Sequence, residues 1–249
     1  MTTASPVREE GRTLVTTSEG IGDEILYAGG LPSLEGEVTL EADHRLWSIF
    51  EKAFPEVICL PRGRAEHGEI GRRISNRELP IPFTDGYLKA PESTGAKYWG
   101  RLAYRGGMRK SLGLSWFSAA SEAKSARLPQ LAELLAHKDY FPVNLQYGDT
   151  TAERHQAGAE MYTDPEADPL VDMNEYFGLV GACDVVVTTS STCLHVAGAL
   201  GVKTYLLLPD IPGPWYWEPG RLPYNSVTVC RGKGEQWVSE ALAQVLKSI

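Results

Sequence analysis

Apolar residues along the chain follow two alternating patterns. Segments with apolar residues at helical spacing separate short apolar runs, and each run is typical of a buried strand. The expected strands are residues 14–16, 38–40, 57–60, 111–116, 143–146, 185–187, 204–208 and 228–230. The expected helices include residues 46–54, 97–105, 129–135, 175–182, 194–200 and 237–246. Strands that alternate with helices predict an α/β fold built on parallel sheets.

The clearest strand–helix–strand unit lies at residues 184–208. Residues 185–187 are three valines, residues 188–192 form a turn rich in hydroxyls, and a helix of small residues then runs to Gly201. In a parallel sheet such a helix begins at the carboxyl edge of its strand, where ligands bind. Its free N–H groups and partial positive charge suit a phosphate. The alternative is an ordinary helix that its own hydroxyls cap.

A second unit of this kind opens the chain. A short strand at residues 14–16 runs into a turn that contains Gly20 and Gly22, and a helix follows through residue 28. The turn lacks the third glycine of a dinucleotide-binding fingerprint, which argues against an NAD-dependent oxidoreductase. Asp23 stands at the start of the helix, where it either caps the backbone or takes part in chemistry.

Composition narrows the class of protein. With 43% hydrophobic and 22% charged residues, the chain has the composition of an ordinary soluble domain. We expect a cytoplasmic protein, because no apolar run approaches the roughly 18 residues of a membrane span and residues 1–12 read as a polar, disordered tail rather than a signal peptide. The four cysteines are scattered without metal-ligand spacing, so we predict no metal site. The net charge of −8 does not favour nucleic acid as a partner.

Basic and aromatic residues suggest where an acceptor would bind. Residues 61–79 are predicted to form a loop whose arginines, Arg72 and Arg73 among them, are either solvated or in contact with an anionic acceptor. Trp215 and Trp217 stand in a loop of prolines and glycines and are predicted to line a cleft. The Gly106-Gly107 pair is predicted to link an N-terminal domain (13–107) to a C-terminal domain (108–249).

Several motifs occur together in one order: EGIGDEILYAGGLPSL (19–34), LGLSW (112–116), VNLQYGD (143–149), CDVVVTTSSTCLHVAGALG (183–201) with TYLLLP after it, and WYW…LPY…VCR (215–231). In this order the chain resembles heptosyltransferase-type glycosyltransferases (glycosyltransferase family 9). The resemblance extends to the catalytic region that follows tetratricopeptide repeats in many bacterial proteins. It implies a GT-B architecture, with two Rossmann-like parallel-sheet halves around a central cleft and a shortened N-terminal half. It also implies inverting, metal-independent transfer of a sugar from a nucleoside-diphosphate sugar to a hydroxyl acceptor.

The same resemblance implies roles for individual residues. Asp23 corresponds to the general base. The leaving diphosphate would be held at the helix start, with a cation from Lys124 or Arg127. The residues implied on the donor side are Gly22, Lys124, Arg127, Gln146, Ser190, Ser191, Thr192 and His195.

One departure from the family pattern leaves an alternative open. Ser190 stands where many heptosyltransferases have aspartate, and the N-terminal half is short. The alternative function is therefore a catalytically silent partner subunit that binds a nucleotide-sugar. The acceptor stays open among a saccharide, a protein side chain and a modified nucleobase in DNA.

Overall fold

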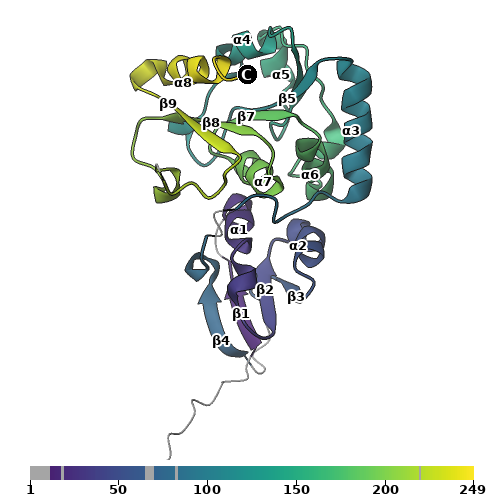
Figure 1. Ribbon diagram of the computed structural model, residues 1–249, viewed down its shortest axis with the longest axis vertical. Helices are drawn as coiled ribbons and strands as arrows, with labels where there is room; N and C mark the ends of the chain where they lie inside the picture. Colours follow the sequence, from purple (N-terminus) through teal and green to yellow (C-terminus); the bar gives the residue numbers. More distant parts are fainter. Residues whose placement is uncertain (1–11, 18–19, 65–69, 82–83, 219) are drawn as a thin grey trace, which may run out of the picture.

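The computed structural model describes residues 12–17, 20–64, 70–81, 84–218 and 220–249. The described strands form two separate sheets, one in each half of the chain, and all their pairings are parallel. The two halves are stacked, and helices α1 and α7 lie where they meet (Figure 1). The predicted α/β class with two parallel-sheet halves is confirmed.

The first sheet has the strand order β3-β2-β1-β4. Chain order reverses at β1, because β2 pairs with one side of it and β4 with the other. Such a reversal marks the crevice where α/β sheets bind ligands. The elements of this half are β1 (Arg12–Thr16), α1 (Ile21–Ala28), β2 (Val38–Ala42), α2 (Trp47–Ala53), β3 (Val57–Pro61) and β4 (Ile70–Ser75).

The second sheet has the strand order β6-β5-β7-β8-β9, and here the reversal lies at β5, between β6 and β7. Its strands are β5 (Lys110–Ser115), β6 (Tyr140–Asn144), β7 (Val185–Thr188), β8 (Thr204–Pro209) and β9 (Val227–Gly232). Its helices are α3 (Glu92–Gly106), α4 (Ala132–Leu135), α5 (Thr151–Gln156), α6 (Met173–Gly181), α7 (Thr192–Leu200) and α8 (Trp237–Leu246). Short 3-10 helices lie at Leu31–Ser33, His44–Leu46, Asn76–Glu78, Glu122–Lys124, Leu128–Leu131, Pro165–Ala167, Trp215–Trp217 and Gly234–Gln236.

Successive residues of the second sheet face two different cores. Val185 and Val187 pack with α8 in one core, whereas Val186 packs with α6 and α7 in the other. This alternation follows from the period of two in a strand. The core on the α7 side continues into the first half, where it includes Ile25 and Leu26 of α1. Packing therefore joins the two halves through α1 and α7.

The prediction of a loop over residues 61–79 is wrong, because residues 70–75 form β4, the edge strand of the first sheet. The charged residues Arg72 and Arg73 interrupt the apolar run that would have predicted a strand. Both are exposed, and charged residues are common on edge strands, where they discourage pairing with another chain.

Helix α3 packs against α6 and β5 and so lies with the second sheet. The predicted domain boundary at residues 107–108 would instead assign α3 to the N-terminal half. The predicted disordered tail falls largely on residues 1–11, outside the described part of the chain, and Arg12 opens β1. Among the described helices, none is long and apolar enough to cross a membrane.

Candidate active site

The first turns of two helices meet between the halves. Helix α1 follows β1, α7 follows β7, and the two helices pack against each other. Gly22, in the first turn of α1, lies directly against the ring of His195 on α7. A Cβ atom added at Gly22 would stand 2.8 Å from His195 Cδ2, closer than real side chains approach. The contact between the two helices therefore requires glycine at this position.

Asp23 follows Gly22 and lies at the meeting point. Its Oδ1 accepts a hydrogen bond of 3.5 Å from the hydroxyl of Tyr216. Burial raises the pKa of Tyr216, and the charge of Asp23 raises it further. Burial also lowers the pKa of Lys124, and the Asp23 charge partly offsets this shift. Asp23, Tyr216 and Lys124 therefore share one electrostatic environment.

His195 is buried, and its environment keeps it neutral. Burial, with a smaller contribution from the charge of Lys124, lowers its pKa to about 3. Its Nδ1 lies 3.1 Å from the hydroxyl of Tyr224. The Tyr224 hydroxyl lies 3.5 Å from that of Tyr87, which donates to the carbonyl of Ile25 at 2.8 Å. A buried chain of polar groups thus runs from α7 to α1.

A cavity of about 200 Å³ opens beside this cluster, at the carboxyl ends of β7 and β8. Ser190, Lys124, Trp217 and Arg231 are among its lining residues. Trp217 is buried, and its Nε1 has no hydrogen-bond partner among the described residues. Lys124 and Arg231 give the cavity two cations, of which Arg231 is also ion-paired with Glu218 at 3.7 Å, and Ser190 adds a hydroxyl. This lining suits an anionic, oxygen-rich ligand.

The start of α7 is open to an external anion. Ser191 is its N-cap, but its side chain makes no capping hydrogen bond and lies 3.3 Å from the Thr188 hydroxyl. The first turn, which begins at Thr192, contains no acidic residue. The N–H groups of a first helical turn have no partner within the helix. These features are compatible with the predicted anion site, and neighbouring Ser190 lines the cavity.

Gln146 and Arg127, both predicted on the donor side, are engaged elsewhere. Gln146 Oε1 accepts hydrogen bonds from the backbone N–H groups of Trp116 at 2.9 Å and Phe117 at 2.8 Å. This side chain fixes the loop after β5 to the end of β6. Arg127 is 63% exposed and forms an ion pair of 2.7 Å with Glu122. Of the two candidate cations, the structure brings Lys124 to the cavity.

The predicted acceptor-side residues do not form one surface. Arg72 and Arg73 are neighbours on β4, and successive strand residues point to opposite faces of a sheet. Trp217 is buried with its ring centroid 5.7 Å from that of His195, and it lines the cavity at the ends of β7 and β8. The side chain of Trp215 lies outside the described part of the chain.

Sequence reasoning missed Tyr216, Tyr224 and Arg231. Tyr216 stands between the two tryptophans that were singled out, and Tyr224 and Arg231 fall in the later part of the same motif region. Their role depends on the path of the loop after β8, which periodicity does not predict. The one available signal was the concentration of aromatic residues in a segment of prolines and glycines.

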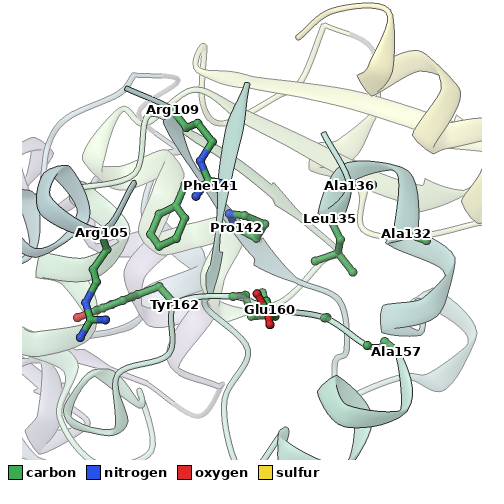
Figure 2. Close-up of a pocket in the computed structure, with 13 residues that line it drawn as sticks. Arg105, Arg109, Ala132, Leu135, Ala136, Phe141, Pro142, Ala157, Glu160 and Tyr162 are labelled. Atoms are coloured by element: carbon green, nitrogen blue, oxygen red, sulfur yellow. The ribbon is translucent and has the colours of Figure 1, made fainter. Parts of the chain in front are cut away.

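A second cavity, of about 710 Å³, lies away from this cluster. It follows the outer edge of β6, between the C-terminal end of α3 and α4, and Figure 2 shows Arg105 and Arg109 on one side of it. Its floor includes Phe141 and Pro142, and none of the predicted site residues lines it.

The cysteines are buried thiols. Burial raises the pKa of Cys193 to about 11 and that of Cys59 to about 12, so both are protonated at neutral pH. In the part of the chain that the structure describes, no group of three or more His, Cys, Asp or Glu side chains is arranged to hold a metal ion.

Comparison with known proteins leads to the same fold as the sequence motifs. No family model matches the chain. The protein FlbA of Caulobacter vibrioides is 27% identical over 79% of this chain, which spans 39% of FlbA. The chain thus corresponds to less than half the length of that relative.

Two solved structures cover nearly the whole chain. The ADP-heptose lipopolysaccharide heptosyltransferase II of E. coli has a TM-score of 0.63 at 12% identity, with 95% of this chain and 98% of the other covered. A family 9 glycosyltransferase of Veillonella parvula has a TM-score of 0.65 at 14% identity, with 96% and 90% covered. The chain therefore has the GT-B-like fold of heptosyltransferases, as its motifs predicted.

Proposed function

We propose that the protein is an inverting, metal-independent glycosyltransferase that moves a sugar from a nucleoside-diphosphate sugar to a hydroxyl acceptor. The observation that carries the proposal is the meeting of two helix starts. One bears a carboxylate, Asp23, and the other is open beside a cavity lined by Lys124 and Arg231. A base and an anion site side by side are what transfer from a diphosphate requires.

The proposed donor-binding site is supported by the charge and the backbone geometry of the cavity. The diphosphate would lie at the start of α7, where Ser190, Ser191 and Thr192 present hydroxyl and N–H groups. Lys124 and Arg231 would supply positive charge. Because the E. coli neighbour is named for ADP-heptose, that compound is the first donor to test.

Each bond change in the reaction has a group assigned to it. The acceptor oxygen attacks the anomeric carbon, and Asp23 takes the acceptor proton as general base. The bond from that carbon to the diphosphate oxygen breaks, which inverts the configuration. The electron pair leaves with the diphosphate, whose charge is stabilised by the helix start and the two cations. Neutral His195 would hold the contact with Gly22 rather than exchange protons.

The acceptor side is less defined. Arg72 and Arg73 are exposed on β4 and remain proposed contacts of an acceptor. Their opposite orientations argue that a single small acceptor meets at most one of them. A saccharide, a protein side chain and a modified nucleobase all remain as acceptor classes to test.

Donor binding is tested by calorimetry and thermal shift with ADP-heptose and with ADP-, UDP-, GDP-, CMP- and dTDP-sugars, with NAD as the control. A ligand that binds only the folded state raises the melting temperature. We expect a shift with one nucleotide-sugar. Lys124→Met should weaken that binding by about tenfold, the effect of losing one charge-assisted contact, and Lys138→Met, an exposed lysine elsewhere, should not. A shift with NAD alone would contradict the proposal.

Turnover separates the enzyme from the silent partner subunit. With the donor identified, release of nucleoside diphosphate is measured in the presence of candidate acceptors, and the anomeric configuration of the product is read by NMR. The enzyme gives acceptor-dependent release and an inverted product. Binding without turnover across the acceptor classes would support the silent subunit instead.

A further inference from the structure

Glu24 is a buried carboxylate directly beside the proposed base, and the proposed reaction gives it no role. It lies in the first turn of α1, next to Asp23, and it is 2% exposed. Burial of a carboxylate is unfavourable unless the group is ion-paired and hydrogen-bonded. The contacts that hold Glu24 therefore indicate what it does in the fold.

The two oxygens of Glu24 bind three different loops. Its Oε1 accepts hydrogen bonds from the hydroxyl of Thr17 at 2.9 Å and from Nε of Arg62 at 2.8 Å. Its Oε2 accepts one from the backbone N–H of Asp43 at 2.9 Å. Thr17 follows β1, Asp43 follows β2 and Arg62 follows β3. One carboxylate therefore joins α1 to the ends of three strands.

The order of the first sheet brings these loops together. Strands β3, β2 and β1 are adjacent and parallel, so their carboxyl ends share one edge, and α1 begins at this edge. Successive helical residues lie about 100° apart around the axis. While Glu24 binds the loops, Asp23 points in another direction, and its Oδ1 meets the hydroxyl of Tyr216 from the second half. The contacts of Glu24 thus fix the rotation of the first turn and the direction of Asp23.

The same contacts continue into the second half of the molecule. The Asp43 carboxylate accepts hydrogen bonds from Arg45, at 2.9 Å from Nε and at 3.0 Å from Nη2. Arg45 Nη1 donates to the carbonyl of Pro169 at 3.0 Å. A hydrogen-bonded path therefore runs from Glu24 through Asp43 to the loop before α6. The turn that carries Asp23 is held relative to both halves.

Arg62 neutralises Glu24, because the two side chains form an ion pair. The other charged and titratable groups that share the environment of Asp23 and Tyr216 are Lys124, Arg77, Tyr27 and Tyr224. The charge of Glu24 also reaches Arg45 and Cys59. Since Glu24 and Arg62 have opposite charges, the loss of either one adds a net charge of known sign close to Asp23.

We propose that Glu24, neutralised by Arg62, is a positioning residue that fixes the first turn of α1 to the ends of β1, β2 and β3 and so holds Asp23 at the cleft. The proposal rests on the proposed function only in taking Asp23 as the base. The contacts themselves do not depend on what the cleft binds.

The pKa of Asp23 is the first quantity to measure, by carboxyl ¹³C NMR with the signal assigned from Asp23→Asn. Glu24→Gln removes the negative charge that neutralises Arg62 and should lower the pKa of Asp23. Arg62→Met leaves the negative charge of Glu24 and should raise it. We expect shifts of about 0.5–1 pH unit in opposite directions. A pKa that moves in neither variant, or in the same direction in both, overturns the proposal.

A matched ion pair separates this effect from a general loss of stability. Arg101 and Asp164 are paired with side chains 43% and 8% exposed, and they lie with the second sheet, away from the cleft. Arg101→Met and Asp164→Asn should leave the pKa of Asp23 unchanged, even where they lower the urea midpoint. An equal shift in these controls would contradict a specific role of Glu24.

Two further variants keep the test decisive if a single variant folds poorly. Arg62→Lys retains the positive charge, and the Arg62 side chain is 39% exposed, so this variant should fold and keep the pKa of Asp23 close to that of the wild type. Glu24→Gln combined with Arg62→Met removes both charges and should also return the pKa towards the wild-type value. A double variant in which the two shifts add rather than cancel overturns the proposal.

Kinetics test whether Glu24 acts through Asp23. Glu24→Gln should lower kcat by about tenfold, because one amide oxygen cannot accept from all three loops, and donor affinity should stay within about threefold. In the Asp23→Asn background the same change should have little further effect on kcat, as expected for residues that act as a unit. An equal loss in both backgrounds would show that Glu24 acts independently of Asp23.

Failure of this proposal and failure of the proposed function give different results. If the pKa of Asp23 responds as expected but no acceptor is turned over, Glu24 positions Asp23 and the transferase proposal fails. If turnover depends on Asp23 while its pKa ignores Glu24 and Arg62, the transferase proposal stands and the positioning role is wrong.

Discussion

Helices α1 and α7 occupy equivalent places in the two halves, yet their first turns differ in charge. Each follows a parallel strand close to the point where strand order reverses. Neither is capped by a side chain, since the N-cap of α1 is Gly20 and the Ser191 hydroxyl makes no capping hydrogen bond. The first turn of α1 carries Asp23 and Glu24, whereas that of α7 has no acidic residue.

This difference suits the two helix starts to different roles in the proposed reaction. In α1 the positive end of the helix is matched by its own carboxylates, so this start offers a base and disfavours a phosphate. Glu24 is buried and accepts from Thr17, Asp43 and Arg62, which leaves the less buried Asp23 as the group that faces the cleft. In α7 the positive end is unmatched and favours an anion.

The largest expected effect comes from removing the base of α1. Asp23→Asn should lower kcat by 10² to 10⁴, the usual contribution of general base catalysis, while donor affinity stays within about threefold. Steady-state kinetics and calorimetry measure the two quantities, with Glu35→Gln as a control at an exposed acid of the same half. Full turnover in Asp23→Asn would mean that the base lies elsewhere.

The next effect comes from separating the two helices. Gly22→Ala places a methyl group 2.8 Å from the His195 ring and should cost about 1–3 kcal/mol of folding stability, as overpacking does. Gly95→Ala in α3 meets nothing within 4 Å and should stabilise the protein by about 0.4–1 kcal/mol. Urea denaturation compares them. Equal stability of the two variants would show that the α1–α7 contact accommodates a methyl group without loss of folding stability.

Giving α7 the charge of α1 tests the comparison directly. Ser191→Asp adds a carboxylate at the N-cap, which should preserve or raise folding stability because aspartate is a good N-cap. The same charge repels a diphosphate, so donor affinity should fall about tenfold. Ser239→Asp, in the first turn of α8, serves as the control. Undiminished donor binding by Ser191→Asp would place the diphosphate away from this helix.

The last prediction concerns the pH dependence that the neutral histidine between the helices gives to folding stability. The folded pKa of His195 is lowered to about 3, against an ordinary value of about 6.5. Below pH 6.5 the unfolded chain binds a proton that the folded chain excludes, so stability falls as the pH falls towards 3.

The slope from this residue is about 1.4 kcal/mol per pH unit between pH 6 and pH 4. Urea midpoints measured across that range should show a shallower dependence in His195→Gln than in the wild type or in His155→Gln, an exposed control. An unchanged slope in His195→Gln would show that His195 titrates normally in the folded protein.

Local features of the fold were predictable from the sequence, and long-range ones were not. The strand, turn and helix at residues 184–201 are coded by three valines, a run of hydroxyl residues and Gly201, which ends α7 in the left-handed conformation at φ 76°. The order of the strands is not coded locally, because the same alternation of elements is compatible with several orders. Strand β4 could not be predicted, because its two arginines interrupt the apolar run that indicates a strand.

The sequence predicted which strands and helices border the candidate site, but not which side chains reach it. Lys124 and Arg127 are both basic and three residues apart, and the conformation of their loop decides which one reaches the cavity. Gln146 stands at a strand end, where ligand-binding residues occur, but its amide binds the backbone of a neighbouring loop. Tyr224 reaches His195 only because Gly198 leaves room for its ring.

The buried chain from His195 through Tyr224 and Tyr87 to Ile25 has a mechanical consequence. Rotation of one half away from the other would pull these hydroxyls apart and leave buried polar groups unpaired, at about 1–3 kcal/mol for each. These contacts therefore oppose separation of the two halves. If the cleft binds the proposed donor, the donor would meet Asp23 and the start of α7 already in position, and its binding free energy would not be diverted to closing the molecule.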